Sequence, residues 1–192
     1  LMTGGFLIAG VLFNMYYQYS YEKDYLSEFS GQGEALDKLE TGTDLAVLKT
    51  GDKSVYRYDQ MGTHSYENSS MQTGTNGTSY YFSVASGDIT NFFNEVDLNT
   101  PWDYHYENLD SRTILDRLAA VKYFVVKAGE EEYLPYGYDT LAAEAEKKDR
   151  LYRAYECKNA LPIGYTYDSY IPEKKYAKMS TVEKQQALLQ GV

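Results

Sequence analysis

Carboxylates are the side chains in this sequence that could act as acids or bases. The candidates include Asp88, Asp103, Glu107, Asp110, Asp116 and Asp168. Glycoside hydrolysis needs two carboxyl groups at a defined separation, and the sequence sets that separation for no pair. A helix cap, a turn or a solvated surface explains each residue equally well: we expect Asp110 to cap a helix and Asp116 to lie on that helix's exterior. We therefore assign no catalytic residue.

The segment Trp102-Asp-Tyr-His-Tyr106 is the densest group of aromatic and titratable side chains. A sugar ring can stack on aromatic rings of this kind. The alternative is a surface loop held in place by aromatic packing. The sequence leaves both interpretations open.

Metal and cofactor motifs do not occur in the sequence. Its single cysteine, Cys157, and its two histidines, His64 and His105, form no CxxC, HExxH or His-rich cluster, so we expect no transition-metal site. The Gly-rich segment Thr73-Gly-Thr-Asn-Gly-Thr78 lacks the lysine of a phosphate-binding loop. A serine nucleophile elbow, G-x-S-x-G, is also missing. We expect neither a metal nor a cofactor.

Composition excludes two classes of protein. The net charge of −10 and pI near 4.7 argue against nucleic acid as a partner, because phosphate binding needs a concentration of Lys and Arg. One cysteine allows no internal disulfide, which excludes the disulfide-stapled secreted class. The 22 tyrosines are typical of surfaces that contact both an apolar phase and water, such as membrane interfaces and binding faces, because the side chain has an apolar ring and a polar tip.

The amino-terminal segment is strongly apolar. Residues 4–17 read GGFLIAGVLFNMYY, and no charge precedes Glu22. This stretch is shorter than the about 20 residues that span a bilayer, and it lacks the basic region of a signal peptide. We interpret residues 1–20 as the end of a transmembrane helix, with tyrosines such as Tyr16 and Tyr21 at the lipid bilayer interface. A buried helix is the alternative.

Residues 21–192 are predicted to form one α+β domain with a mixed or mostly antiparallel sheet and flanking short helices. The clearest element pair is a helix beginning at Asp110 or Ser111, followed by a buried strand over 121–126. Further strands are expected at 54–58, 80–84, 150–155 and 163–167. Two short helices or one broken helix are expected between Gly33 and Leu48, a short helix after Ser86, and a helix that opens with the capping box Ser180-Thr-Val-Glu183.

The order of several segments resembles the YfhO family of bacterial membrane proteins. These segments are Phe13-Asn-Met-Tyr16, Ser54-Val-Tyr-Arg57, Thr75-Asn-Gly-Thr-Ser-Tyr-Tyr-Phe-Ser83, Leu115-Asp-Arg-Leu-Ala-Ala-Val-Lys-Tyr-Phe124, Pro135-Tyr-Gly-Tyr138 and Asn159-Ala-Leu-Pro-Ile-Gly164. Each segment alone is unspecific, but their combination covers nearly the whole chain in order.

The resemblance implies a polytopic membrane glycosyltransferase of the GT-C type that transfers sugar from a polyprenyl-phosphate carrier to cell-wall polymers such as teichoic acids. This chain would be its extracytoplasmic domain, near the carboxyl end and joined to the preceding membrane helix. The catalytic carboxylates would lie in an early outer loop, beyond this chain. The expected partners are the rest of the parent protein, the bilayer, and a cell-wall glycan or polyprenyl-linked sugar. Tyr80, Tyr81, Trp102 and Tyr104 are the predicted sugar-facing aromatics.

Two other classes of function remain open. One is a cell-surface module that binds glycan or protein through its tyrosines without enzymatic activity, as Tyr-rich paratopes do. The other is a glycosidase whose carboxylates form no recognisable motif. Many membrane spans in the complete reading frame would favour the glycosyltransferase interpretation, and a signal peptide alone would favour the binding module.

Overall fold

The computed structural model describes residues 2–19, 32, 34–61, 67–98 and 104–191. It divides the chain into two compact units, Leu1–Lys38 and Leu39–Val192. The first unit contains α1 (Met2–Tyr19) and most of α2 (Ala35–Leu39).

Helix α1 carries its apolar side chains on the surface. Phe6, Leu7 and Phe13 are each more than half exposed, and Phe13 stacks on Tyr17 one turn later. Within the described ranges, no helix combines the length and the hydropathy needed to cross a bilayer. The interpretation of residues 1–20 as the end of a transmembrane helix stays a prediction.

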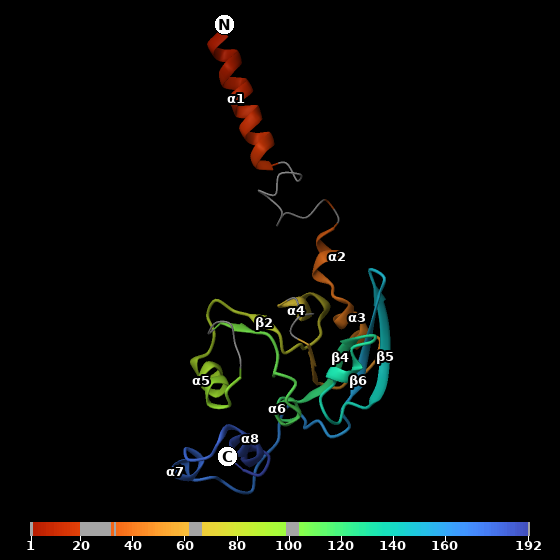
Figure 1. Ribbon diagram of the computed structural model, residues 1–192, viewed down its shortest axis with the longest axis vertical. Helices are drawn as coiled ribbons and strands as arrows, with labels where there is room; N and C mark the ends of the chain where they lie inside the picture. Colours follow the sequence, from red (N-terminus) through yellow and green to blue (C-terminus); the bar gives the residue numbers. More distant parts are fainter. Residues whose placement is uncertain (1, 20–31, 33, 62–66, 99–103, 192) are drawn as a thin grey trace. The chain divides into compact units, whose positions relative to one another are not determined.

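The second unit is built on a four-stranded mixed sheet with the order β1-β4-β6-β5 (Figure 1). Its strands are β1 (Arg57–Gln60), β4 (Val121–Lys127), β5 (Thr140–Lys147) and β6 (Arg150–Glu156). Strand β1 is parallel to β4, while β4, β6 and β5 pair antiparallel. A separate antiparallel pair joins β2 (Tyr80–Tyr81) to β3 (His105–Tyr106). The predicted α+β class with a mixed sheet is confirmed.

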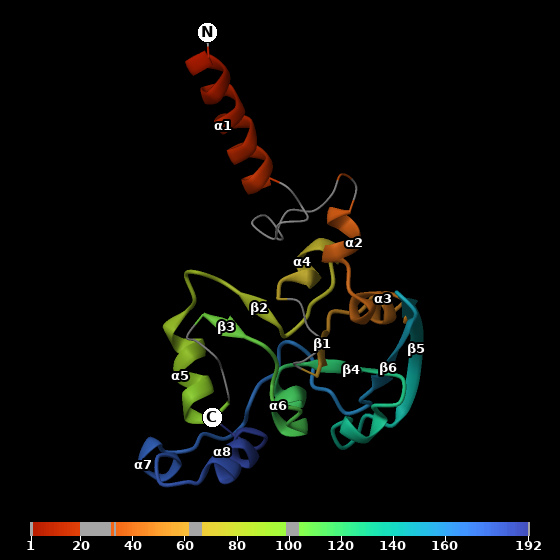
Figure 2. The same cartoon turned by 45° about the horizontal axis from the view of Figure 1, so that its top comes forward.

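Strand β4 is an inner strand of the sheet, and both of its faces are buried. Tyr123 and Val125 pack in one apolar cluster with α3 (Gly42–Leu48), whereas Phe124 and Val126 pack in a second cluster with Leu115 of α6 (Thr113–Leu118). Figure 2 shows α3 and α6 on opposite sides of this strand. The burial explains the continuous apolar run of β4, because alternate side chains of a strand point to opposite faces.

Short helices complete the second unit. They are α4 (Ser69–Thr73), α5 (Gly87–Glu95), the 3₁₀ helix η3 (Glu131–Tyr133), α7 (Glu173–Tyr176) and α8 (Thr181–Leu188). The predicted capping box opens α8: the Ser180 side chain accepts from the Glu183 amide, and the Glu183 carboxylate accepts from the Ser180 amide. The two short helices expected between Gly33 and Leu48 are also confirmed as α2 and α3.

Several local predictions are wrong. The strand expected at 54–58 runs over Arg57–Gln60 instead, and the strand expected at 80–84 covers Tyr80–Tyr81 alone. Helix α6 begins after Arg112, because Asp110 and Ser111 have left-handed backbones with φ of 54° and 53°, unlike the extended backbone of a cap. Residues 163–167 form no strand. Their tyrosines form hydrogen bonds to the last residues of two helices instead. The Tyr165 hydroxyl donates to the Leu118 carbonyl of α6, and the Tyr167 hydroxyl donates to the Leu188 carbonyl of α8.

Candidate functional site

The β2–β3 pair sorts its aromatic side chains onto two faces. Tyr80 lies opposite Tyr106 and Tyr81 lies opposite His105, so consecutive residues point in opposite directions. On one face, the rings of Tyr81, Tyr104 and His105 form a group that we call the aromatic cluster. Its ring centroids are 5.6 Å apart for Tyr81 and Tyr104 and 4.8 Å apart for Tyr81 and His105. Tyr81 is 38% exposed and Tyr104 is 41% exposed, so a ligand can reach both.

Two consecutive residues before α4 hold the aromatic cluster in place. The Asn68 side chain donates to the Tyr81 carbonyl at 2.9 Å and accepts from the Tyr81 amide at 3.0 Å, as a neighbouring strand would. The His105 ring nitrogen Nδ1 lies 2.5 Å from a carboxylate oxygen of Glu67. Asn68 has a left-handed backbone with φ of 63°, a conformation that asparagine tolerates better than most residues. Glu67 and Asn68 therefore fix the orientation of the aromatic cluster.

The aromatic cluster combines two partly exposed tyrosine rings with polar atoms at their edges. Aromatic rings stack on apolar ligand faces, and the Tyr hydroxyls and the His105–Glu67 pair can exchange hydrogen bonds with hydroxyl groups. This suits a sugar ring. Trp102, the fourth predicted aromatic, lies outside the described residues.

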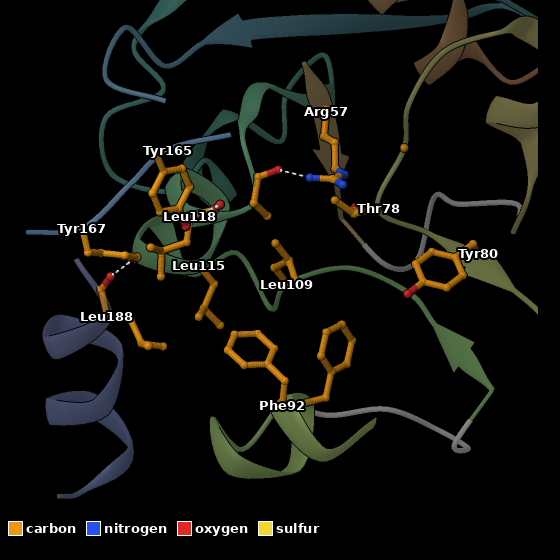
Figure 3. A pocket seen from close by; sticks show the side chains of 13 residues that line it. Arg57, Thr78, Tyr80, Phe92, Leu109, Leu115, Leu118, Tyr165, Tyr167 and Leu188 are labelled. Carbon is orange, nitrogen blue, oxygen red and sulfur yellow. Dashed lines mark hydrogen bonds between the residues drawn. The ribbon is translucent and has the colours of Figure 1, made fainter. Parts of the chain in front are cut away.

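Tyr80 faces away from the aromatic cluster. Its ring contacts Tyr106 at 4.7 Å and Phe82 at 5.3 Å between centroids, and it lines a cavity of about 380 Å³. Figure 3 shows this cavity between β2, α5 and α6. Burial, together with the neighbouring Tyr106, raises the pKa of Tyr80 above its ordinary value, so the phenol stays neutral. The structure thus brings Tyr81 and Tyr104 together and places Tyr80 elsewhere.

Asp116 does not lie on the exterior of α6 as expected. Its side chain is fully buried, and neither carboxylate oxygen has a hydrogen-bond partner among the described residues. Burial first and the charge of Asp59 second raise its pKa well above 3.8. The helical spacing of α6 identified Leu115 as buried, but only the packing of α6 against β4 buries the next residue as well.

Asp59, the neighbour of Asp116, is buried on β1 and anchors three segments. Its carboxylate accepts from the Thr78 hydroxyl at 2.6 Å, the Gln60 amide at 2.7 Å and the Leu109 amide at 3.1 Å. Both carboxylates are fully buried, so a glycan cannot reach them as an acid and base pair. Among the described residues, no three His, Cys, Asp or Glu side chains are placed to hold a metal ion.

Comparison with known proteins identifies relatives along almost the whole chain. The model of the family described as bacterial membrane protein YfhO matches residues 3–192. A protein of Bacillus subtilis (strain 168), described as uncharacterized protein YfhO, is 27% identical over 203 residues. That alignment covers 98% of this chain and 22% of the relative, so the chain spans less than a quarter of the relative's length. No solved structure matches the chain. The chain belongs to the YfhO family of bacterial membrane proteins.

Proposed function

We propose that this chain is an extracytoplasmic, non-catalytic domain of a membrane glycosyltransferase that decorates cell-wall polymers, such as teichoic acid, from a polyprenyl-phosphate sugar donor. Membership of a bacterial membrane protein family supports the location at the membrane. The exposed apolar face of α1 fits contact with the bilayer. The chain corresponds to 22% of its relative, which leaves most of the parent protein to carry the chemistry.

The observation that carries this proposal is the aromatic cluster. Tyr81 and Tyr104 are 38% and 41% exposed, Tyr81 meets both Tyr104 and His105 edge to face, and Asn68 and Glu67 hold Tyr81 and His105 by hydrogen bonds. A surface that is ordered before binding pays little entropy when a sugar ring stacks on it. In this role the domain holds the acceptor polymer or the carried sugar beside the membrane-embedded site.

The charges of the domain favour contact with sugar rings over contact with an anionic polymer backbone. The chain has a net charge of −10. Lys122, a basic residue of β4, forms ion pairs with Asp52 at 2.5 Å and Glu156 at 3.6 Å. An anionic polymer therefore finds little free positive charge there, so we assign the contact to the glycosyl groups.

The test is made in the full-length parent protein. Tyr81→Ala combined with Tyr104→Ala is expected to reduce wall-polymer glycosylation several-fold, measured by the sugar content of purified polymer at equal protein abundance. Tyr133→Ala with Tyr136→Ala, which removes two exposed tyrosines outside the cluster, is the matched control. Trp102→Ala with Tyr104→Ala extends the test to the remaining predicted residue. Unchanged glycosylation in both Tyr81→Ala with Tyr104→Ala and Trp102→Ala with Tyr104→Ala would remove the aromatic cluster from the proposal.

A further inference from the structure

The cavity lined by Tyr80 is chemically two-sided. Its apolar wall is made by Phe92, Leu115, Leu118 and Leu188, from α5, α6 and α8. In Figure 3, Arg57 and Tyr80 lie on the side away from Leu115 and Leu188. A volume of about 380 Å³ is within the range of about 300–1,000 Å³ that small-molecule pockets occupy.

Arg57 is the cationic residue of this cavity. Its Nη1 donates to the Ala119 carbonyl at 2.8 Å, and its backbone amide donates to the Ala120 carbonyl at 2.9 Å, so the residue is fixed to the end of α6. A guanidinium carries five N–H donors, and this bond uses one of them. Among the described residues, no carboxylate forms an ion pair with Arg57, and no acidic side chain lines the cavity.

Tyr80 offers a second polar group. Its hydroxyl makes no hydrogen bond within the described part of the chain, and Figure 3 shows it directed toward the cavity. The neutral phenol can donate to an anion beside Arg57. The polar side of the cavity therefore offers several unused donors and a full positive charge.

We propose that this cavity binds a single-chain anionic amphiphile, with its phosphate or carboxylate head on Arg57 and Tyr80 and its apolar chain against Phe92, Leu115 and Leu188. Charge complementarity selects the head, because a partly buried guanidinium gains most from an anion that reaches its free N–H groups. The ligand's alkyl chain is favoured because it buries apolar surface against these side chains. A free sugar fits poorly, since its hydroxyl groups would lose water against leucine and phenylalanine side chains.

Binding to the 192-residue chain is measured by isothermal titration calorimetry with probes below their micelle-forming concentrations. The probes are decyl phosphate, decanoate, decanol and inorganic phosphate. We expect decyl phosphate, decanoate or both to bind at least about tenfold more tightly than decanol, from charge-assisted hydrogen bonds to Arg57. The tighter anion identifies the head group. Inorganic phosphate is expected to show no saturable binding.

Variants distinguish binding in the cavity from binding to the exposed apolar side chains of α1, which can also attract alkyl chains. Arg57→Gln is expected to weaken binding of the anionic probe about tenfold and to leave decanol unchanged. Lys53→Gln makes the same charge change at an exposed position four residues earlier and is expected to change nothing. Leu188→Trp, which narrows the apolar side, is expected to weaken every alkyl probe. Circular dichroism and thermal unfolding confirm that each variant folds.

Three results would overturn the proposal. They are equal affinity for decyl phosphate and decanol, equal loss in Arg57→Gln and Lys53→Gln, and inorganic phosphate binding as tightly as the amphiphile. The proposal is independent of the glycan-binding role. Tyr81→Ala with Tyr104→Ala, in the aromatic cluster that faces away from Tyr80, is expected to leave amphiphile affinity unchanged, so either proposal can fail alone.

Discussion

The Tyr58 hydroxyl donates a hydrogen bond to the buried carboxylate of Asp44, and this bond joins β1 to α3. Asp44 also accepts from the Thr41 hydroxyl at 2.7 Å and the Thr75 hydroxyl at 3.2 Å. A fully buried carboxylate is thus satisfied by hydroxyl donors. Burial, and then the charge of Asp44, raises the pKa of Tyr58 far above its ordinary value, so the phenol keeps its proton.

Removing that hydroxyl is expected to destabilise the protein. Tyr58→Phe leaves one oxygen of the buried Asp44 carboxylate short of a donor, which costs about 1–3 kcal/mol in the free energy of unfolding. Urea denaturation followed by circular dichroism measures the loss. Tyr56→Phe removes the hydroxyl of a less buried tyrosine two residues earlier and is expected to cost less than about 0.5 kcal/mol. Equal losses in the two variants would contradict the importance of the Tyr58–Asp44 bond.

Gly42, the first residue of α3, is required by a close contact. A Cβ atom at this position would lie 2.1 Å from Cε2 of Tyr152 on β6. Gly42→Ala is therefore expected to displace the ring and to lower stability by about 1–3 kcal/mol, measured by thermal unfolding. Gly87→Ala, at the first residue of α5 with no atom within 4 Å of the added Cβ, serves as the control. It is expected to be neutral or stabilising by up to about 1 kcal/mol.

Asp116 is expected to make stability depend on pH. Its pKa is raised in the folded protein, so the folded chain keeps a proton that the unfolded chain releases above 3.8. The folded state binds more protons in that range, and stability therefore falls as the pH rises from about 4 toward the folded-state pKa. Urea denaturation at several pH values from 4 to 8 measures this slope.

Asp116→Asn tests the origin of that slope. The substitution keeps the shape of the side chain, removes the carboxyl group that must hold a proton in the folded state, and supplies an N–H donor beside Asp59. We expect a flatter pH profile and a gain of about 1 kcal/mol or more at pH 7. Asp168→Asn, at an exposed carboxylate, is expected to leave the slope as it is. A slope that survives Asp116→Asn would assign the effect to another group.

Asn68 is expected to protect the backbone of the aromatic cluster. Asn68→Ala removes both bonds to Tyr81, so the Tyr81 amide should exchange with solvent hydrogen faster by tenfold or more, on the order of one lost hydrogen bond. Hydrogen exchange followed by nuclear magnetic resonance measures that rate. Asn68→Asp keeps the acceptor for the Tyr81 amide and should retain most of the protection. Equal exchange in the two variants would show that the side-chain oxygen is not the protecting group.

Elements whose signal is local were predictable. The pair α6 and β4 follows from helical spacing around Leu115 and an uninterrupted apolar run, and the cap of α8 follows from Ser180 and Glu183. Strand β5 was not predicted. Its residues TLAAEAEK are rich in Ala and Glu, which favour helices. It forms because β6 pairs with it after a turn at Lys148 and Asp149, both with positive φ although neither is glycine.

The family, the α+β class and the acidic, tyrosine-rich character of the chain follow from its sequence, because these depend on composition, periodicity and the order of segments. What individual side chains face follows from the packing of the folded chain. It turned Tyr81 to the surface and Tyr80 into a cavity, buried Asp116 beside Asp59, and brought Arg57 to the end of α6. The physical reason is that burial and charge partners come from segments distant in sequence, which the local pattern does not contain.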